Sequence, residues 1–422
     1  MKKLVLLLCI FYASISFAQV EASRHETIFK PRFYFDIANY KSDKLGKTKV
    51  AVFLAVPYSN IQFVKSNKGF EANYFLTITF YDEDENIVTE RTWKEKVITP
   101  QFNRTISRTS SNLSYKTFDL TPGKYTLGCS IEDNDSKKNF QIKTPIEVLN
   151  FKDSVEVSDL VLAEKIVRTK TGDRILPNIS QIVTTRDSTI LFFFEVYSDK
   201  DRTVQIEYSL RDQKKNLVAR KSNTLKLDKG KNVIYQNFEH QNFTLGNYDL
   251  LVQIKNEEGK NIKGIGKRFV SKIYGFPSNI TDLDKAIEQM IYIASHSEIN
   301  YINEAKTYKE KLARFISFWK KKDPSPNTLE NEVLNEYFRR VAYANAHFKS
   351  YYEGWKTDMG MIYITLGPPN QVERQPVAID SKPYEVWLYY DLNKTFVFVD
   401  KTNFGDYYLV NPIFGDWYRY RQ

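Results

Sequence analysis

Four carboxylates in the last third of the chain are the side chains best suited to chemistry: Asp323, Glu330, Glu332 and Asp358. A pair of carboxylates flanking a glycosidic bond hydrolyses it, one as acid and the other as base or nucleophile. No recognisable grouping of nucleophile, base and orienting residue surrounds any of the four. The sequence contains no Gly-rich phosphate loop, no Gly-x-Ser-x-Gly turn and no His-rich metal motif. We therefore predict no catalytic residue, metal or cofactor, and keep a glycan hydrolase that uses these carboxylates as an alternative to a non-catalytic protein.

Helical periodicity surrounds these carboxylates. Apolar residues recur every three to four positions, which predicts helices over 281–294 with Thr281 as N-cap, over 298–321, and over 327–347. Pro324 and Pro326 must end the second helix, and Asn327 to Glu330 resembles a capping box for the third. Later segments alternate and predict strands over 362–366, 384–390, 395–400 and 407–410. We expect an α+β domain over 276–422, with helices in 281–348 and a small sheet in 361–410.

Two arginines on the third predicted helix, Arg339 and Arg340, follow Glu332 by about two turns. Residues seven positions apart return to the same helix face. Guanidinium groups bind carboxylates through charge-assisted, often paired hydrogen bonds. We therefore predict a network of these arginines with Glu330 and Glu332 that fixes the helices to the sheet.

The first two-thirds of the chain repeat one plan of short alternating strands. The segment from Thr121 to Tyr125 matches Thr244 to Tyr248, 123 residues later, and each precedes a strand that ends in an acidic turn. Tyr125 and Tyr248 resemble the corner tyrosine of immunoglobulin-like sandwiches. We predict two tandem antiparallel β-sandwiches of this kind, over 19–150 and 151–275. Their aromatic residues are expected mainly in the cores.

Composition and charge set broad limits. The 422 residues are 42% hydrophobic and 27% charged, which is typical of a globular protein. The net charge is +10, with +3 over residues 19–150, +6 over 151–275 and −1 over 276–422. No basic run is long enough to indicate nucleic-acid binding, but a basic exported surface can meet anionic lipid or polysaccharide. After loss of Cys9, Cys129 has no cysteine to pair with, so we expect it to be a buried hydrophobic residue.

The N-terminus has the form of a signal peptide. Lys2 and Lys3 precede an apolar run over 4–15, and Ser16-Phe17-Ala18 is a small-x-small cleavage site. Cys9 follows a leucine, not the small residue that a lipoprotein signal requires. We predict removal of residues 1–18, export to the periplasm or the outer membrane, and no transmembrane segment in the remaining chain.

The segment Gly354-Trp355-Lys356-Thr357-Asp358 resembles the signature of the bacterial GWxTD domain, and further similarities extend over about residues 280–410. The resemblance implies an exported envelope protein, often with β-domains before the signature, and implies no known reaction. Met359 and Met361 stand where this family often has arginine, and Asn370 where it usually has aspartate. The matching positions, for which we expect a structural or interaction role, are Gly354, Trp355, Thr357, Asp358, Gly367, Pro368, Trp387, Asp323, Pro324, Glu330, Glu332 and Arg339.

The function expected from these features is that of a non-catalytic protein of the Gram-negative cell envelope. It would act as a scaffold or accessory in an outer-membrane or secretion assembly, with envelope proteins or a surface glycan as partners and no nucleic acid. A surface glycan-binding module is the second alternative, after the hydrolase. Ser154 and Ser188 each follow an aspartate in a pattern that is glycosylated in some envelope proteins. The oligomeric state is not encoded in any recognisable pattern.

Overall fold

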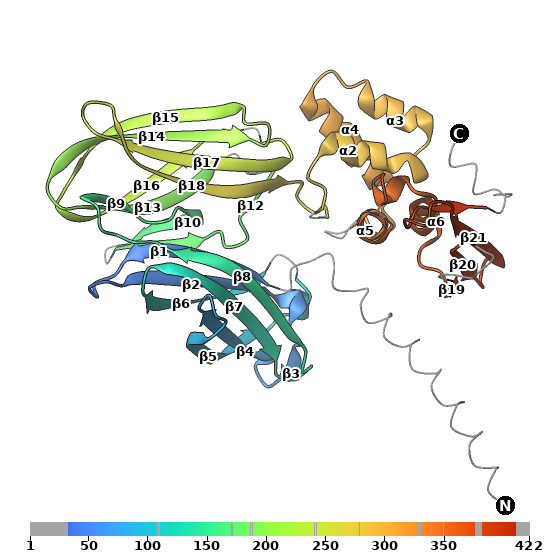
Figure 1. Ribbon diagram of the computed structural model, residues 1–422, viewed down its shortest axis with the longest axis horizontal. Helices are drawn as coiled ribbons and strands as arrows, with labels where there is room; N and C mark the ends of the chain where they lie inside the picture. Colours follow the sequence, from blue (N-terminus) through green and yellow to red (C-terminus); the bar gives the residue numbers. More distant parts are fainter. Residues whose placement is uncertain are drawn as a thin grey trace, which may run out of the picture. The chain divides into compact units, whose positions relative to one another are not determined.

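The computed structural model describes residues 33–410, except 108–109, 170–171, 186, 188, 240, 242, 278, 327–330, 349 and 376–381. The predicted signal peptide, Glu330 and Ser188 lie outside the described residues. The chain divides into two compact units, with the boundary between Tyr274 and Gly275. The chain is mostly β-structure, with several sandwich-like sheets and a helical C-terminal region (Figure 1).

The first half of the N-terminal unit is a pair of sheets around one core. One sheet has the order β1-β2-β6, formed by β1 (Tyr34–Lys41), β2 (Thr48–Pro57) and β6 (Ser111–Leu120). The other has the order β3-β4-β7-β8 with β5 also paired to β4, formed by β3 (Val64–Ser66), β4 (Gly69–Tyr81), β5 (Ile87–Thr99), β7 (Gly123–Asp133) and β8 (Asn139–Val148). The turns η2 (Tyr58–Asn60) and α1 (Phe102–Thr105) lie between strands. Side chains from both sheets share one apolar cluster. Cys129 is buried in it, and burial raises the pKa of its thiol to about 12.

The second half is built in the same way. One sheet has the order β11-β10-β13-β16 with β9 also paired to β13, formed by β9 (Val155–Val157), β10 (Val161–Thr169), β11 (Gly172–Pro177), β13 (Ile190–Ser198) and β16 (Gly230–Phe238). The other has the order β12-β18-β17-β14-β15, formed by β12 (Ile182–Thr184), β14 (Arg202–Asp212), β15 (Leu217–Leu227), β17 (Gly246–Lys255) and β18 (Asn261–Lys272). In β14 the alternate residues Val204, Ile206, Tyr208 and Leu210 are buried, as a strand with one face on a core requires.

The strand order of the first half recurs in the second. The order β1-β2-β6 corresponds to β10-β13-β16, and the order β5-β4-β7-β8 corresponds to β15-β14-β17-β18. Tyr125 and Tyr248 occupy equivalent places in β7 and β17. The Tyr125 hydroxyl donates to the carbonyl oxygen of Thr121 at 2.9 Å, and the Tyr248 hydroxyl donates to that of Thr244 at 3.2 Å. Each tyrosine therefore fixes the chain four residues before it.

Buried polar groups join the two halves. Asn39 in β1 donates from its backbone and its side chain to Asp159 Oδ2, at 2.8 and 2.7 Å. Asp36 in β1 forms an ion pair with Lys267 of β18, and their side chains are only 4% and 13% exposed. Burial raises the pKa of the Asp36 carboxyl above its usual value despite the nearby ammonium group. The halves therefore meet through specific hydrogen bonds, in addition to apolar contacts around Phe193.

The C-terminal unit combines short helices with one antiparallel sheet. The helical elements are α2 (Leu283–Glu288), η3 (Gln289–Tyr292), α3 (His296–Asn303), α4 (Tyr308–Lys321), α5 (Glu332–His347), η4 (Gly354–Lys356) and α6 (Asp358–Leu366). The sheet has the order β19-β20-β21-β22, formed by β19 (Gln371–Gln375), β20 (Tyr384–Tyr389), β21 (Lys394–Asp400) and β22 (Tyr407–Leu409). Apolar side chains of α6 pack on those of β20 and β21 in one core. Within the described part of the chain, no helix combines the length and the apolarity needed to cross a bilayer.

Four predictions about this unit were wrong. The third predicted helix, α5, begins at Glu332 and not at 327, because Asn331 caps it by accepting from the Leu334 backbone. Residues 362–366 belong to helix α6 and not to a strand, so the sheet begins at Gln371 and not at 361. These residues are apolar on all sides because α6 is almost entirely buried, and a short apolar run does not distinguish a buried helix from a buried strand. The predicted helix over 298–321 is two helices, because Thr307 caps a new one by accepting from the Glu310 backbone. The first helix is capped by Asp282 and not by Thr281.

Candidate functional site

Gly354 of the signature segment and Gly360, two residues after it, allow three backbones to approach closely. A Cβ atom on Gly354 would lie 1.8 Å from the carbonyl oxygen of Ala344 in α5. A Cβ atom on Gly360 would lie 1.9 Å from the carbonyl oxygen of Gly354 itself. Any side chain at either position would therefore force α5, η4 and α6 apart. The signature glycine has a steric function in this unit.

Trp355 anchors the turn η4 to neighbouring segments through hydrogen bonds. Its side chain is only 2% exposed. Its backbone N–H donates to Asn345 Oδ1 at 3.1 Å, and its carbonyl oxygen accepts from the Tyr292 hydroxyl at 2.9 Å. The indole N–H donates to Glu353 Oε2 at 3.0 Å. The residue is a hydrogen-bonded anchor of the core, as its size and single donor favour.

Thr357 and Asp358 organise the start of α6. The Thr357 hydroxyl donates to the carbonyl oxygen of Gly354 at 2.7 Å and accepts from the Gly360 N–H at 3.0 Å, so Thr357 is the N-cap. Asp358 Oδ2 accepts from the backbone N–H of Leu409 at 2.9 Å. This bond ties the N-terminal end of α6 to strand β22, and the helix dipole favours a negative charge there.

Arginines of α5 share one carboxylate, which the sequence analysis missed. Arg339 donates from Nε and Nη2 to the two oxygens of Glu336, both at 2.7 Å, and Arg340 Nε donates to Glu336 Oε1 at 2.8 Å. Arg340 also donates to the carbonyl oxygens of Ile364 and Thr365 at 3.1 and 3.3 Å. Burial disfavours ionisation of Glu336, but the two guanidinium groups outweigh it and hold the pKa of this carboxyl below its usual value.

This arrangement corrects the predicted network. Glu336, and not Glu332, is the carboxylate that binds Arg339, and Arg340 ties α5 to the end of α6 rather than to the sheet. The spacing of three and four residues from Glu336 to the arginines is the usual spacing of ion pairs on one helix, so the sequence did contain the signal.

The end of α6 and the sheet are joined through two further signature positions. Gly367 has a φ of +88°, and its carbonyl oxygen accepts from the Tyr389 hydroxyl at 2.7 Å. Pro368 follows and is exposed. Trp387 in β20 is 2% exposed, contacts the rings of Phe348 and Phe398, and donates to Glu385 Oε2 at 3.2 Å. These residues build the core and its connections.

The carboxylates before α5 are arranged around a turn. Asp323 Oδ1 accepts from the backbone N–H of Ser325 at 2.9 Å, and the Ser325 hydroxyl donates to Glu332. Pro324 between them is exposed. Asp358 instead has its hydrogen bond with β22, so these contacts do not unite the three carboxylates in one group. Among the residues described here, no group of three or more His, Cys, Asp or Glu side chains could hold a metal ion.

Comparisons with known proteins identify the C-terminal part. Residues 253–411 match the GWxTD domain, so the match starts in β17, before the segment in which the resemblance was noticed. The chain therefore carries a GWxTD domain. No curated protein matches the chain.

Solved structures show only distant likeness. They include an alkylpurine DNA glycosylase of Pseudomonas fluorescens bound to DNA (12% identity, TM-score 0.20, 28% of this chain and 30% of that one). Red sea bream transglutaminase has 9% identity and a TM-score of 0.18, and the match covers 57% of this chain and 31% of that one. A Bacteroides uniformis β-glucuronidase has 9% identity and a TM-score of 0.22, and the match covers 53% of this chain and 26% of that one. This chain thus covers about a third or less of each of them, and these TM-scores are too low to establish a common fold or function.

Proposed function

We propose that this chain is a non-catalytic interaction protein of the bacterial cell envelope, exported by its N-terminal segment. It would act as a scaffold or accessory of an outer-membrane or secretion assembly. In this proposal residues 19–150 and 151–275 are two immunoglobulin-like sandwiches that present the GWxTD domain to a partner. The recurrence of strand order and of the two corner tyrosines supports this description of the N-terminal unit.

One observation carries the proposal. The described signature side chains are used in contacts within the domain: Trp355 is buried, Thr357 caps α6, Asp358 binds β22 and Arg339 binds Glu336. A catalytic carboxylate needs a free face directed at substrate, and a pair needs a common cleft. Asp358 is instead bonded to the backbone of a strand. These residues are therefore better suited to holding a rigid surface than to catalysing a reaction.

Replacing each carboxylate by its amide distinguishes a scaffold protein from a hydrolase. We expect Asp358→Asn to lower the free energy of unfolding by about 1–3 kcal/mol, because a charge-assisted hydrogen bond to β22 is weakened. Its in-cell activity, scored by complementation of a deletion strain, should fall only as far as its stability falls. Asp323→Asn and Glu332→Gln should be milder in both measurements, and Glu330→Gln completes the set.

If the protein is a hydrolase, the amide variants should give the opposite result. A catalytic carboxylate changed to its amide leaves the fold intact, or stabilises it, while activity is lost. One amide variant with the parent melting temperature and parent pull-down partners, but without complementing activity, would therefore refute the scaffold. Recovery of complementation by a stabilised Asp358→Asn protein would support it.

Export has its own test. We expect the protein isolated from the source envelope to begin at Gln19, because the small-x-small site ends at Ala18. N-terminal sequencing and intact mass determine this directly. A chain that begins at Met1, or one that carries lipid on Cys9, would contradict the prediction.

A further inference from the structure

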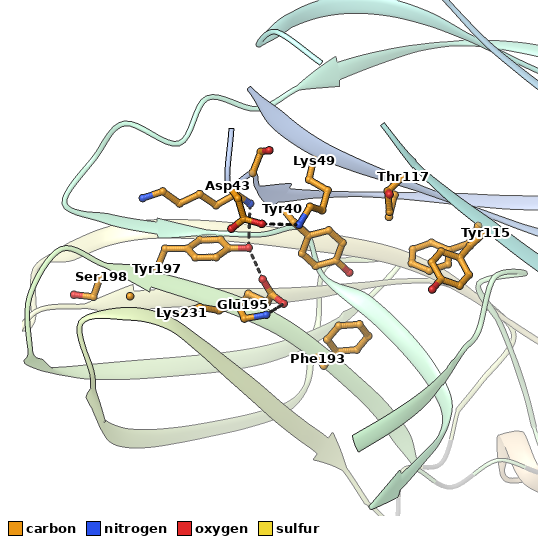
Figure 2. A pocket seen from close by; sticks show the side chains of 15 residues that line it. Tyr40, Asp43, Lys49, Tyr115, Thr117, Phe193, Glu195, Tyr197, Ser198 and Lys231 are labelled. Carbon is orange, nitrogen blue, oxygen red and sulfur yellow. Dashed lines mark hydrogen bonds and ion pairs between the residues drawn. The ribbon is translucent and has the colours of Figure 1, made fainter. Parts of the chain in front are cut away.

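A cleft in the N-terminal unit lies between the outer faces of two sheets. It encloses about 520 Å³, within the range of about 300–1,000 Å³ that is usual for small-molecule sites. One wall comes from β1, β2 and β6, and the other from β13 and β16. Figure 2 shows the rings of Tyr40, Tyr115 and Phe193 around the same opening. The cleft contains no residue of the matched GWxTD segment.

The cleft has more aromatic side chains than packing between the two halves explains. Phe193 is 8% exposed and belongs to the apolar cluster between the halves, so packing explains it. Tyr115 is different, because it is 64% exposed on the outer face of β6. Its ring lies 6.0 Å from that of Phe53, with 30° between the planes. The two rings thus present apolar faces to the cleft at a place where a strand normally carries polar residues.

Fixed polar groups line another part of the same cleft. Glu195 accepts from the Tyr197 hydroxyl and pairs with Lys231 at 3.3 Å (Figure 2). The Tyr197 hydroxyl in turn accepts from the Lys41 backbone N–H at 3.0 Å, so the carboxylate is held in position from both halves. The Tyr40 hydroxyl, partly buried in the wall, makes no hydrogen bond with any residue that the structure describes. It is available to a ligand.

The lining has a small excess of positive charge. Three lysines and two carboxylates line the cleft. Lys231 pairs with Glu195, and Lys49 lies 3.5 Å from the fully exposed Asp43. Lys41 Nζ is 6.0 Å from the Tyr197 ring and has no carboxylate partner within the described part of the chain. The surrounding segments are also basic, at +3 and +6.

We propose that this cleft binds an acidic saccharide, a uronate- or sulfate-bearing segment of an envelope polysaccharide. Sugar rings have apolar C–H faces that stack on aromatic rings, and hydroxyl edges that need donors and acceptors. Tyr115 and Phe53 supply the stacking surface, Glu195 and Tyr40 bind hydroxyl groups, and Lys41 with Lys49 binds the acid group. The inference stands independently of the role proposed for the GWxTD domain.

The experiment is affinity electrophoresis of the full-length mature protein through polygalacturonate, alginate and chondroitin sulfate, with dextran and laminarin as neutral polymers. We expect retardation by at least one acidic polymer and less by both neutral ones. Titration of the retarding polymer should give an affinity about tenfold weaker for Tyr115→Ala, in which a stacked ring is lost. Tyr40→Phe, which removes only the hydroxyl, should weaken it about three- to tenfold.

Matched variants separate the cleft from general surface charge. Phe75→Ala removes an aromatic ring that is 37% exposed on another sheet, and Lys124→Ala removes an exposed lysine outside the cleft. Neither should change the affinity, whereas Lys41→Ala should weaken acidic binding severalfold. Parent-like melting temperatures of Tyr115→Ala and Lys41→Ala ensure that a loss of binding is local. Retardation by none of the acidic polymers, by neutral polymers alone, or to the same extent in Tyr115→Ala and the parent would overturn the proposal.

Discussion

Replacing Trp355 by alanine is expected to lower the free energy of unfolding of the C-terminal unit by about 3–5 kcal/mol, as other deletions of large aromatic core residues do. The indole is 2% exposed, so its removal leaves a cavity. It also leaves Glu353 without the indole donor, although Lys285 still binds that carboxylate. Chemical denaturation followed by far-UV circular dichroism measures the effect. Tyr351→Ala is the matched control, because Tyr351 is 85% exposed and its loss should change stability by less than about 0.5 kcal/mol.

Gly354→Ala examines the same site without removing a large side chain. The added methyl group would meet the Ala344 carbonyl at a distance that no real contact allows, so α5 and η4 must separate. We expect a loss of about 3 kcal/mol or more, at the upper end of the range for overpacked sites. All tryptophans remain, so fluorescence can follow the transition. A Gly354→Ala protein as stable as the parent would show that these backbones do not approach as described.

Local patterns in the sequence predicted several features of both units. The match of Thr121 to Tyr125 with Thr244 to Tyr248 indicated two equivalent segments, because the glycine, the tyrosine and the following strand are adjacent in the chain. Burial of Trp355 and Trp387 followed from their size and the apolar character around them. The helix over Asp358–Leu366 was missed because its residues are buried on every side and show no amphipathic period.

Contacts between residues far apart in the sequence could not be predicted from such local patterns. Asp36 and Lys267 are 231 positions apart, and no local sequence pattern around either residue indicates that they pair. The cleft likewise combines Tyr115 with Glu195, which belong to different repeats. The division into sandwiches over 19–150 and 151–275 remains a prediction. The buried polar contacts between the two halves affect whether each half can fold alone. If the halves are separated, Asp36 and Asn39 lose the partners that they have in the other half.

Removing one partner of this junction should also have a large effect on stability. Lys267→Met leaves the Asp36 carboxylate buried without its cation, and breaking a buried ion pair in this way costs about 3–5 kcal/mol. Urea denaturation of the full chain at pH 7 measures it. Lys49→Met is the control, because its ion pair with Asp43 is exposed and should contribute less than about 1 kcal/mol.

The pH dependence identifies the cause of that loss. The pKa of Asp36 is already raised by burial, with the charge of Asp159 adding to the rise and Lys267 opposing it. Without Lys267 the pKa must rise further. A carboxyl group with a raised folded-state pKa binds protons more readily when folded, so its cost is present at pH above that pKa and disappears as the pH falls toward the unfolded value. The deficit of Lys267→Met should therefore shrink between pH 7 and about pH 4.

A double variant separates the effect of the Asp36 charge from the packing of the Lys267 side chain. In Asp36→Asn/Lys267→Met the buried charge is gone, while an amide oxygen can still accept from Gln181, as the carboxylate does at 2.8 Å. We expect this protein to recover most of the stability lost in Lys267→Met at pH 7, and to show little change of its remaining deficit with pH. If the double variant is as unstable as Lys267→Met, or if the single deficit is the same at pH 7 and pH 4, packing of the lysine stem and not the charge of Asp36 determines the loss. The two halves would then be held together mainly by apolar contacts such as those around Phe193.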